Sequence, residues 1–267
     1  MDNIPRLGFG TYGRTNQDGV EAIGFALETG YRHLDTAQSY NNEKEVGTAL
    51  AQSTIDRADI WVTTKVDMAN FGIGKLIPSL EISLEKLGGP VDLALIHWPS
   101  PNNEIALEVY LEQIQEAKSQ GLTRHIGVSN FPIAMLKQAE KILGKGEILT
   151  NQFELNPGFQ NKTLADFCQA SGILVTCYQP IAQGRLGSNP DMQIIAKNHD
   201  ATPSQVALAW ELAKNYSAIP TSSKKERIRS NFDASTLQLT DPEMEIIGAI
   251  DQAPRSIAPD WGPAWDE

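Results

Sequence analysis

The sequence is poor in cysteine and in positive charge, and it has no long apolar run. Its two cysteines, Cys168 and Cys177, form neither a CxxC pair nor a zinc-ligand spacing, so we interpret both as small buried hydrophobic residues rather than a disulfide. The net charge of −11 argues against nucleic-acid or anionic-membrane partners, whose binding needs stripes of Lys and Arg. No stretch approaches the roughly 18 apolar residues of a membrane span, and the N-terminus lacks a signal-peptide pattern, so a cytoplasmic protein is expected.

Histidine is scarce as well. The four histidines, His33, His97, His125 and His199, show neither HxH nor HExxH spacing. These spacings supply the ligands of metal-dependent hydrolases, so that class is disfavoured and no metal site is expected.

Eight short apolar runs rich in β-branched residues alternate with segments of helical periodicity. The runs are residues 6–10, 31–35, 60–65, 91–97, 125–128, 149–153, 173–178 and 218–220. Thr202 followed by Pro203 is typical of a helix start, and leucines recur at helical spacing over residues 76–87. Runs that are apolar on both faces indicate strands of a buried parallel sheet. The sequence therefore predicts an α/β fold, a (β/α)8 TIM barrel with a single domain over residues 1–267.

Four polar residues fall at or just beyond the ends of successive predicted strands, where an α/β barrel carries its active site. Asp35 ends the second run, Tyr40 follows after a short turn, and Lys65 and His97 end the third and fourth runs. A tyrosine of pKa about 10 is a slow proton donor at neutral pH unless an ammonium stabilises its phenolate, and a carboxylate can orient that ammonium. Such a set fits carbonyl reduction, with a proton from tyrosine and a hydrogen bond from histidine.

Each of these residues also has an ordinary structural interpretation. Asp35 could cap a helix, Lys65 could be a solvated strand end, and His97 could be a satisfied core residue. Their coincidence at equivalent strand ends favours catalysis.

A second pattern competes with the barrel. Residues 8–13 match GxGxxG after a predicted strand, and Asp35 follows at the distance typical of a dinucleotide-binding fingerprint. However, we expect residues 14–19 to form a turn, so that no helix opens at the third glycine. Eight strand units also exceed the usual six of a doubly wound sheet.

The chain resembles the aldo-keto reductase family from end to end. The motifs that carry this resemblance occur in the family's order at residues 30–40 with Asn42-Glu43, then 63–65, 95–99, 126–131, 151–157 and 219–223. Residues 97–102, 150–152 and 258–261 are similar to the bacterial 2,5-diketo-D-gluconate reductase B type, also described as a methylglyoxal reductase. The resemblance implies reduction of aldehydes and ketones to alcohols with NADPH.

The resemblance also implies individual roles for the strand-end residues. Tyr40 would be the proton donor, Lys65 would lower its pKa, Asp35 would pair with Lys65, and His97 would orient the carbonyl. The substrate pocket would be formed by Tyr12, Tyr40, His97, Trp98 and Trp261.

The implied cofactor site spans several loops. Ser129, Asn130 and Gln152 would hold the nicotinamide carboxamide, Tyr178 would stack on the ring, and the pyrophosphate would lie along residues 179–186. The full implied set is Gly10, Thr11, Tyr12, Ser129, Asn130, Gln152, Tyr178, Gln179, Pro180, Ile181, Gln183, Gly184, Arg185, Ile219, Pro220, Thr221, Ser222, Ser223, Lys224, Arg227 and Asn231. Structural alternatives stay open: residues 129–130 could cap the next helix, Tyr178 could be core, and the basic run 224–229 could be a solvated helix face.

The chain departs from the family's pattern in two places. Thr221 stands where many members have a Lys that touches the 2′-phosphate, so NADPH is favoured and NADH is less excluded than usual. The N-terminal β-hairpin that closes the barrel bottom in many relatives is expected to be missing.

The remaining expectations concern substrate, tail and alternative function. The loop after His97 is short, which favours small aldehydes and α-dicarbonyls such as methylglyoxal, with 2,5-diketogluconate as a further candidate. The tail, residues 251–267, carries two Trp and is expected to pack as a loop near the barrel mouth, with a surface-docked tail as the alternative. A monomer is expected. The other functional candidate is a cofactor-binding, redox-sensing regulatory protein with little turnover, against which the intact Asp35, Tyr40, Lys65 and His97 argue.

Overall fold

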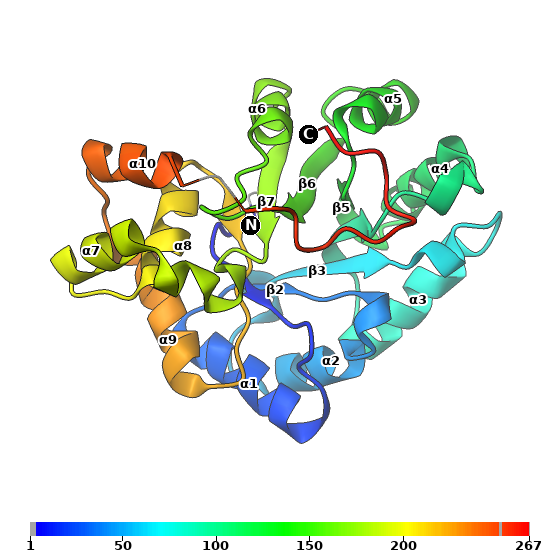
Figure 1. Cartoon of the computed structure of the whole chain (residues 1–267). Coiled ribbons are helices and arrows are strands. Elements are labelled where there is room, and N and C mark those ends of the chain that lie inside the picture. Colours follow the sequence, from blue (N-terminus) through cyan, green and yellow to red (C-terminus); the bar gives the residue numbers. More distant parts are fainter. Residues whose placement is uncertain (1–3, 251–252, 267) are drawn as a thin grey trace.

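The computed structural model, which describes residues 4–250 and 253–266, contains one sheet of eight parallel strands in chain order, surrounded by helices (Figure 1). The strands are β1 Phe9–Gly10, β2 His33–Asp35, β3 Trp61–Val66, β4 Val91–Ile96, β5 Thr123–Ser129, β6 Ile148–Glu154, β7 Leu174–Tyr178 and β8 Ser217–Ala218. Each predicted run overlaps one of them, and the predicted (β/α)8 barrel is confirmed.

The helices follow the strands and cover the outside of the barrel. They are α1 Asn16–Thr29, α2 Glu43–Gln52, α3 Leu76–Leu87, α4 Leu107–Ser119, α5 Ile133–Leu143, α6 Lys162–Ala170, α7 Pro190–Asn198, α8 Pro203–Ala213, α9 Lys225–Asp233 and α10 Asp241–Gly248. The predicted start of α8 is confirmed: Thr202 and Gln205 form a reciprocal capping box with Pro203 at the first helical position. None of the helices in the described residues is long and apolar enough to cross a membrane.

The barrel closes where Gly8 and the end of β1 meet β8 and the residues that follow it. Gly8 N donates to Ala218 O at 2.9 Å, and Gly10 N donates to Pro220 O at 3.0 Å. A Cβ atom on Gly10 would lie 2.7 Å from Ile219 O, so a larger residue would push these two segments apart. Gly10 therefore serves barrel closure, and it brings the loops after β1 and β8 together at the carboxyl ends of the strands.

The amino end of the barrel is filled by apolar side chains. Ile4 packs with Trp61, Leu93 and Leu95, and all four are buried. Residues 4–8 form no hairpin: they run directly into β1. In the described part of the chain, the floor that a hairpin covers in many relatives is closed by Ile4 and by Trp61 stacked on His125.

One local expectation is wrong. We expected residues 14–19 to form a turn, but α1 begins at Asn16, three residues after Gly13. Positive φ at Gly13 (72°) and Asn16 (58°) turns the chain within a few residues, which leaves room for α1 to begin at Asn16. Asn42 Nδ2 holds this turn by donating to Thr11 O and to Arg14 O. The closed barrel nevertheless excludes the doubly wound alternative.

Glu211 on α8 is a charged residue buried without a partner. Its side chain has 0% exposure, and neither carboxylate oxygen has a hydrogen-bond partner among the described residues. Burial raises its pKa well above the ordinary value, so the folded protein holds it in the neutral form. In the unfolded chain it ionises above about pH 4.3, and stability therefore falls as pH rises above that value.

We expect Glu211→Gln to stabilise the protein at pH 8 and to leave stability nearly unchanged at pH 4. A neutral amide has no proton to lose on unfolding, so the gain grows with pH; a gain of about 1 kcal/mol corresponds to roughly 2–4 °C in melting temperature for a chain of this size. Melting curves at both pH values measure it, with Glu226→Gln on the exposed face of α9 as the control. An equal effect at both pH values would contradict the neutral carboxyl.

Candidate active site

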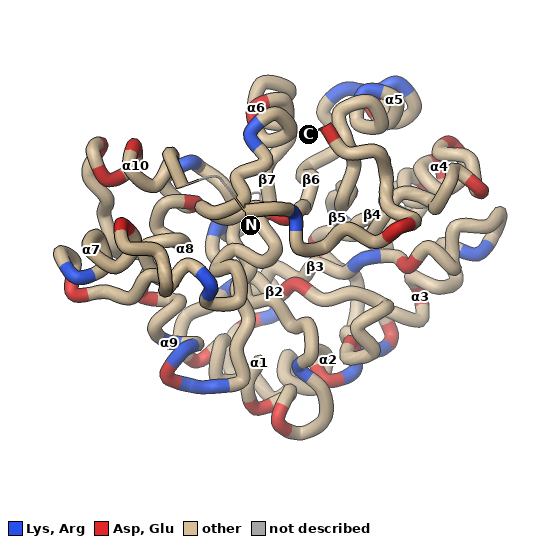
Figure 2. Tube along the Cα trace, viewed as in Figure 1, with Lys and Arg blue, Asp and Glu red and all other residues tan. Residues whose placement is uncertain are grey.

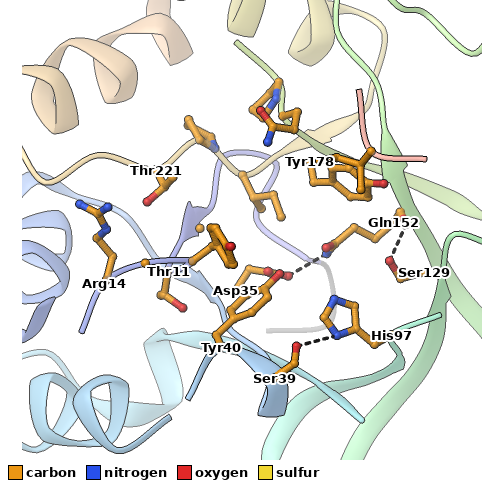
Figure 3. Close-up of a pocket in the computed structure, with 18 of the residues that line it drawn as sticks. Thr11, Arg14, Asp35, Ser39, Tyr40, His97, Ser129, Gln152, Tyr178 and Thr221 are labelled. Atoms are coloured by element: carbon orange, nitrogen blue, oxygen red, sulfur yellow. Dashed lines mark hydrogen bonds between the residues drawn. The ribbon is translucent and has the colours of Figure 1, made fainter. Parts of the chain in front are cut away.

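A cavity of about 580 Å³ opens at the carboxyl ends of the strands (Figure 3). Its lining residues are Gly10, Thr11, Tyr12, Gly13, Arg14, Asp35, Ser39, Tyr40, His97, Trp98, Ser129, Asn130, Gln152, Tyr178, Gln179, Pro180, Ile181, Gln183, Ile219, Pro220, Thr221 and Ile257. They come from nearly every strand end. The barrel topology thus gathers side chains that are far apart in the sequence.

Lys65 links the carboxylate and the phenol beneath this cavity. Its Nζ is fully buried and donates to Asp35 Oδ1, to Thr36 O at 2.9 Å and to Tyr40 Oη at 3.2 Å. Asp35 ends β2, Lys65 lies one residue before the end of β3, and Tyr40 ends the short 3₁₀ turn Gln38–Tyr40. Register places Asp35 beside Thr63, so the two strand ends hold the pair in contact.

The electrostatics of this group keep the lysine charged and the tyrosine protonated. Burial opposes the charged form of Lys65, but Asp35 and Tyr40 outweigh it and raise the lysine pKa. Burial raises the pKa of Tyr40, and the ammonium of Lys65 opposes that rise without cancelling it. The phenol therefore keeps its proton, while the ammonium of Lys65 favours the phenolate form.

His97 lies directly after β4 and is held in its neutral form. Burial, followed by the nearby charge of Lys65, lowers its pKa to about 3. Ser39 Oγ lies 3.2 Å from His97 Nδ1, and the imidazole meets the Tyr40 ring edge-on with centroids 5.6 Å apart. When Ser39 donates to Nδ1, the other ring nitrogen carries the proton and can donate to a carbonyl oxygen.

A polar network follows the ends of β5, β6 and β7. Ser129 Oγ donates to Gln152 O at 2.8 Å, and Gln152 Nε2 donates to Asp35 Oδ2 at 2.7 Å. Tyr178 Oη donates to Asn130 Oδ1 at 2.8 Å, and Asn130 Nδ2 donates to His97 O at 3.1 Å. These amides and hydroxyls connect the ends of β5, β6 and β7 to Asp35 and to the backbone of His97.

The loops after β7 and β8 contribute only part of the residues expected there. Gln179, Pro180, Ile181 and Gln183 line the cavity, as do Ile219, Pro220 and Thr221. The remaining expected residues, which are Gly184, Arg185, Ser222, Ser223, Lys224, Arg227 and Asn231, do not line it. The basic run over residues 224–229 lies around the start of α9, where Lys224, Lys225, Arg227 and Arg229 are exposed (Figure 2).

The tail crosses the mouth and is fastened by a buried carboxylate. Glu154, at the end of β6, accepts hydrogen bonds from Ser256 N at 3.0 Å, from Ser256 Oγ and from Ile257 N at 2.8 Å. Ile257 consequently reaches the cavity wall. Asp266 Oδ2 accepts from Ile133 N, the first residue of α5, at 2.9 Å.

Trp261 does not line the cavity but packs behind its wall. Its ring meets Trp98 edge-on at 5.2 Å, and Trp265 meets the same ring at 6.1 Å. Residues 251, 252 and 267 of the expected tail loop lie outside the described residues.

Sequence reasoning missed four cavity residues: Gly13, Arg14, Ser39 and Ile257. Ser39 directly precedes Tyr40 in the turn, so its place was a usable signal. Arg14 was missed because residues 14–19 were expected to form a turn without a part in the site. Among the described residues, no group of three or more His, Cys, Asp and Glu side chains is placed to hold a metal ion.

Comparison with known proteins agrees with this geometry. The model of the Aldo/keto reductase family matches residues 6–252. The chain belongs to the aldo-keto reductase family. This aldo-keto reductase is accordingly an oxidoreductase that reduces carbonyl groups.

Individual relatives resemble this aldo-keto reductase over nearly its whole length. Methylglyoxal reductase DkgB of Yersinia pestis is 43% identical over 266 residues, covering 99% of this chain and 100% of that protein. The 9,11-endoperoxide prostaglandin H2 reductase of Trypanosoma cruzi is 38% identical and covers 94% of this chain and 89% of its own. The crystal structure of a putative 2,5-diketo-D-gluconic acid reductase B superposes with a TM-score of 0.95 at 33% identity, covering 100% of this chain and 95% of that one.

Proposed function

We propose that this aldo-keto reductase uses NADPH to reduce small aldehydes, ketones and α-dicarbonyls such as methylglyoxal, with Tyr40 as the proton donor. The observation that carries the proposal is the buried ammonium of Lys65, which joins Asp35 to the Tyr40 hydroxyl at the floor of the cavity, next to neutral His97. We further propose that the enzyme acts as a cytoplasmic monomer.

The residues present fit a dinucleotide. The hydroxyls of Thr11 and Thr221 are buried at the cavity wall without hydrogen-bond partners among the described residues, which leaves them available to a ligand. Ser129, Asn130 and Gln152 would hold the carboxamide, and Tyr178 would pack against the ring. When bound, the reduced nicotinamide supplies the hydride for the carbonyl carbon.

Side chains of the protein orient and protonate the carbonyl oxygen. His97 donates a hydrogen bond that fixes the oxygen near Tyr40, and Tyr40 transfers its proton to that oxygen. Lys65 stabilises the phenolate left behind, and Asp35 keeps Lys65 in place and charged. The contacts of Lys65 with Asp35 and with Tyr40 on which the last two roles depend are already formed in the structure.

The cavity walls favour a small substrate. Tyr12, Trp98 and Ile257 line the same cavity as His97 and Tyr40, and the Trp98 ring packs against Trp261 and Trp265. The names of the relatives point the same way, to methylglyoxal and to 2,5-diketogluconate.

Absorbance at 340 nm tests the proposal directly. Methylglyoxal, a substituted benzaldehyde and 2,5-diketogluconate are each offered with NADPH and, in parallel, with NADH. We expect NADPH-dependent loss of absorbance, fastest with methylglyoxal. Tight NADPH binding without turnover of any substrate would instead favour the redox-sensing regulatory protein.

A substitution in the exposed basic run, residues 224–229, shows which part of the cofactor this run contacts. We expect Arg227→Ala to weaken NADPH binding about tenfold and NADH binding far less, because a 2′-phosphate held by a guanidinium loses a charge-assisted hydrogen bond. Dissociation constants from fluorescence titration measure it, with Arg229→Ala on the same helix as the control. Equal weakening of both dinucleotides would remove Arg227 from the 2′-phosphate site.

A further inference from the structure

Tyr40 ends a 3₁₀ turn of only three residues, Gln38–Tyr40. Two of the three side chains belong to the site. Tyr40 Oη accepts a hydrogen bond from Lys65 Nζ, and Ser39 Oγ lies 3.2 Å from His97 Nδ1 (Figure 3). A 3₁₀ turn has weaker internal hydrogen bonds than an α-helix, so contacts outside the turn must help to hold it in place.

The third side chain of the turn, Gln38, bridges it to two neighbouring segments. Its Oε1 accepts from Asp67 N and from Asn70 Nδ2, both at 2.9 Å, in the loop after β3. Its Nε2 lies 3.1 Å from Ser79 O, 3.2 Å from Ser79 Oγ and 3.1 Å from Ser83 Oγ, all on α3. The half-buried amide thus uses both lone pairs of its oxygen and both hydrogens of its nitrogen.

The partners of the Gln38 amide fix its orientation. Asp67 N can only donate and Ser79 O can only accept, so Oε1 faces the loop after β3 and Nε2 faces α3. Ser79 Oγ donates to Leu76 O at 2.7 Å and Ser83 Oγ donates to Ser79 O at 3.3 Å, which leaves the hydroxyl lone pairs to the amide. Ser83 is buried, and the other buried side chains of α3 are all leucines. A serine at such a position indicates a specific hydrogen bond.

The hydrogen bond to Asp67 N ties the turn to the strand that carries Lys65. Gln38 lies two residues before Tyr40, and Asp67 lies two residues after Lys65, directly after the end of β3. The Gln38 amide therefore joins the chain beside the phenol to the chain beside the ammonium. The contact of 3.2 Å between Lys65 Nζ and Tyr40 Oη depends on the distance that this amide sets.

We propose that Gln38 is a positioning residue for proton transfer: its amide holds the Tyr40 turn against the end of β3 and keeps the Tyr40 hydroxyl in contact with Lys65. The inference rests on the proposed role of Tyr40 as the proton donor. Gln38 does not itself line the cavity, so it acts on the reaction through the two residues that it holds together. A displacement of about 1 Å at a catalytic group costs on the order of 100-fold in rate, which makes this contact important.

The test is Gln38→Met, which keeps the length of the side chain and removes every hydrogen bond of its amide. We expect kcat/KM for methylglyoxal to fall about 10- to 100-fold. The dissociation constant for NADPH should stay within about twofold, because the cavity lining is unchanged. Quenching of tryptophan fluorescence measures that constant, since Trp98 lines the cavity. Gln38→Asn, whose amide is one methylene shorter, should show the same fall and the same binding, and it replaces Gln38→Met if that variant does not fold.

Gln113→Met is the matched control. Gln113 Nε2, on α4, donates to Phe71 O at 3.2 Å, to Gly72 O at 3.3 Å and to Val109 O at 2.9 Å. Its amide therefore also holds the loop after β3, but at residues other than those that Gln38 binds. Melting temperatures of the two methionine variants compare the loss of stability, and the control should retain its activity.

A double-mutant cycle with Tyr40→Phe distinguishes positioning from a general structural role. Without the phenol hydroxyl there is no donor to position, so Gln38→Met/Tyr40→Phe should react within about twofold of Tyr40→Phe alone. The loss of NADPH absorbance in a single turnover measures these low rates. General damage to the site would instead lower the residual rate by a further factor as large as in the wild-type background.

The outcomes separate this proposal from the function on which it rests. Normal kcat/KM in folded Gln38→Met would overturn the Gln38 proposal alone. A fall that is equally large in the Tyr40→Phe background, or that comes with an equal weakening of NADPH binding, would make Gln38 a structural residue and also overturn the proposal. If Tyr40→Phe itself turned over normally, the proposed proton donor would be wrong, and the Gln38 proposal would fail with it.

Discussion

Tyr40→Phe is expected to lower kcat/KM for carbonyl reduction by about 10²–10⁴-fold, the range that a positioned general acid contributes. The substitution removes the Oη atom that receives a hydrogen bond from Lys65 at 3.2 Å and leaves the ring in place against Tyr12 and His97. Because the ring survives, the dissociation constant for NADPH should stay within about twofold. Steady-state kinetics with methylglyoxal and a fluorescence titration measure the two quantities.

Tyr110→Phe serves as the matched control for this experiment. It removes another phenol hydroxyl, on α4, which contacts Ser100 N and lies outside the cavity. Activity should survive that change. Near-normal turnover by Tyr40→Phe would show that another group donates the proton.

Lys65→Met is expected to abolish most activity and also to destabilise the fold. Asp35 would be left as a buried carboxylate facing Gln152 without its ammonium, and breaking a buried pair in this way costs about 3–5 kcal/mol. The phenolate of Tyr40 would lose its stabilising charge at the same time. Thermal melting and kcat/KM measure the two effects separately.

The double variant Asp35→Asn/Lys65→Met separates stability from catalysis. Removing both charges relieves the unpaired carboxylate, so we expect much of the lost stability to return while activity stays low. If activity returned along with stability, Lys65 would be a structural residue only. If stability did not return, the cost would lie in packing around Lys65 rather than in the unpaired charge.

The barrel and the centre of its site could be predicted from the sequence because topology does the positioning. Parallel strands bring their carboxyl ends to one mouth of the barrel. Residues at strand ends, such as Asp35, Lys65 and His97, therefore lie close together regardless of the conformation of the loops between the strands. Strand ends can be found from hydrophobicity alone. The juxtaposition of these residues needed no knowledge of side-chain packing.

Loop residues could not be predicted in the same way. Arg14 reaches the cavity because Gly13 and Asn16 take positive φ and Asn42, from the next strand–helix unit, holds the loop. That contact is tertiary and leaves no periodic trace in the sequence. Ile257 reaches the cavity only because Glu154 binds the tail at a distance of about a hundred residues along the chain, a contact that no local pattern encodes.

The contacts that hold the tail also determine at which end of the chain a fusion partner or tag can be attached. The segment that carries Ile257 into the cavity is held by Glu154 and again at α5 by Asp266, so a fusion partner or immobilising tag at the C-terminal end would strain the segment that lines the cavity. Ile4 lies at the other end of the barrel, among the side chains that close the floor. A purification tag, a surface anchor or a reporter domain therefore belongs at the N-terminal end.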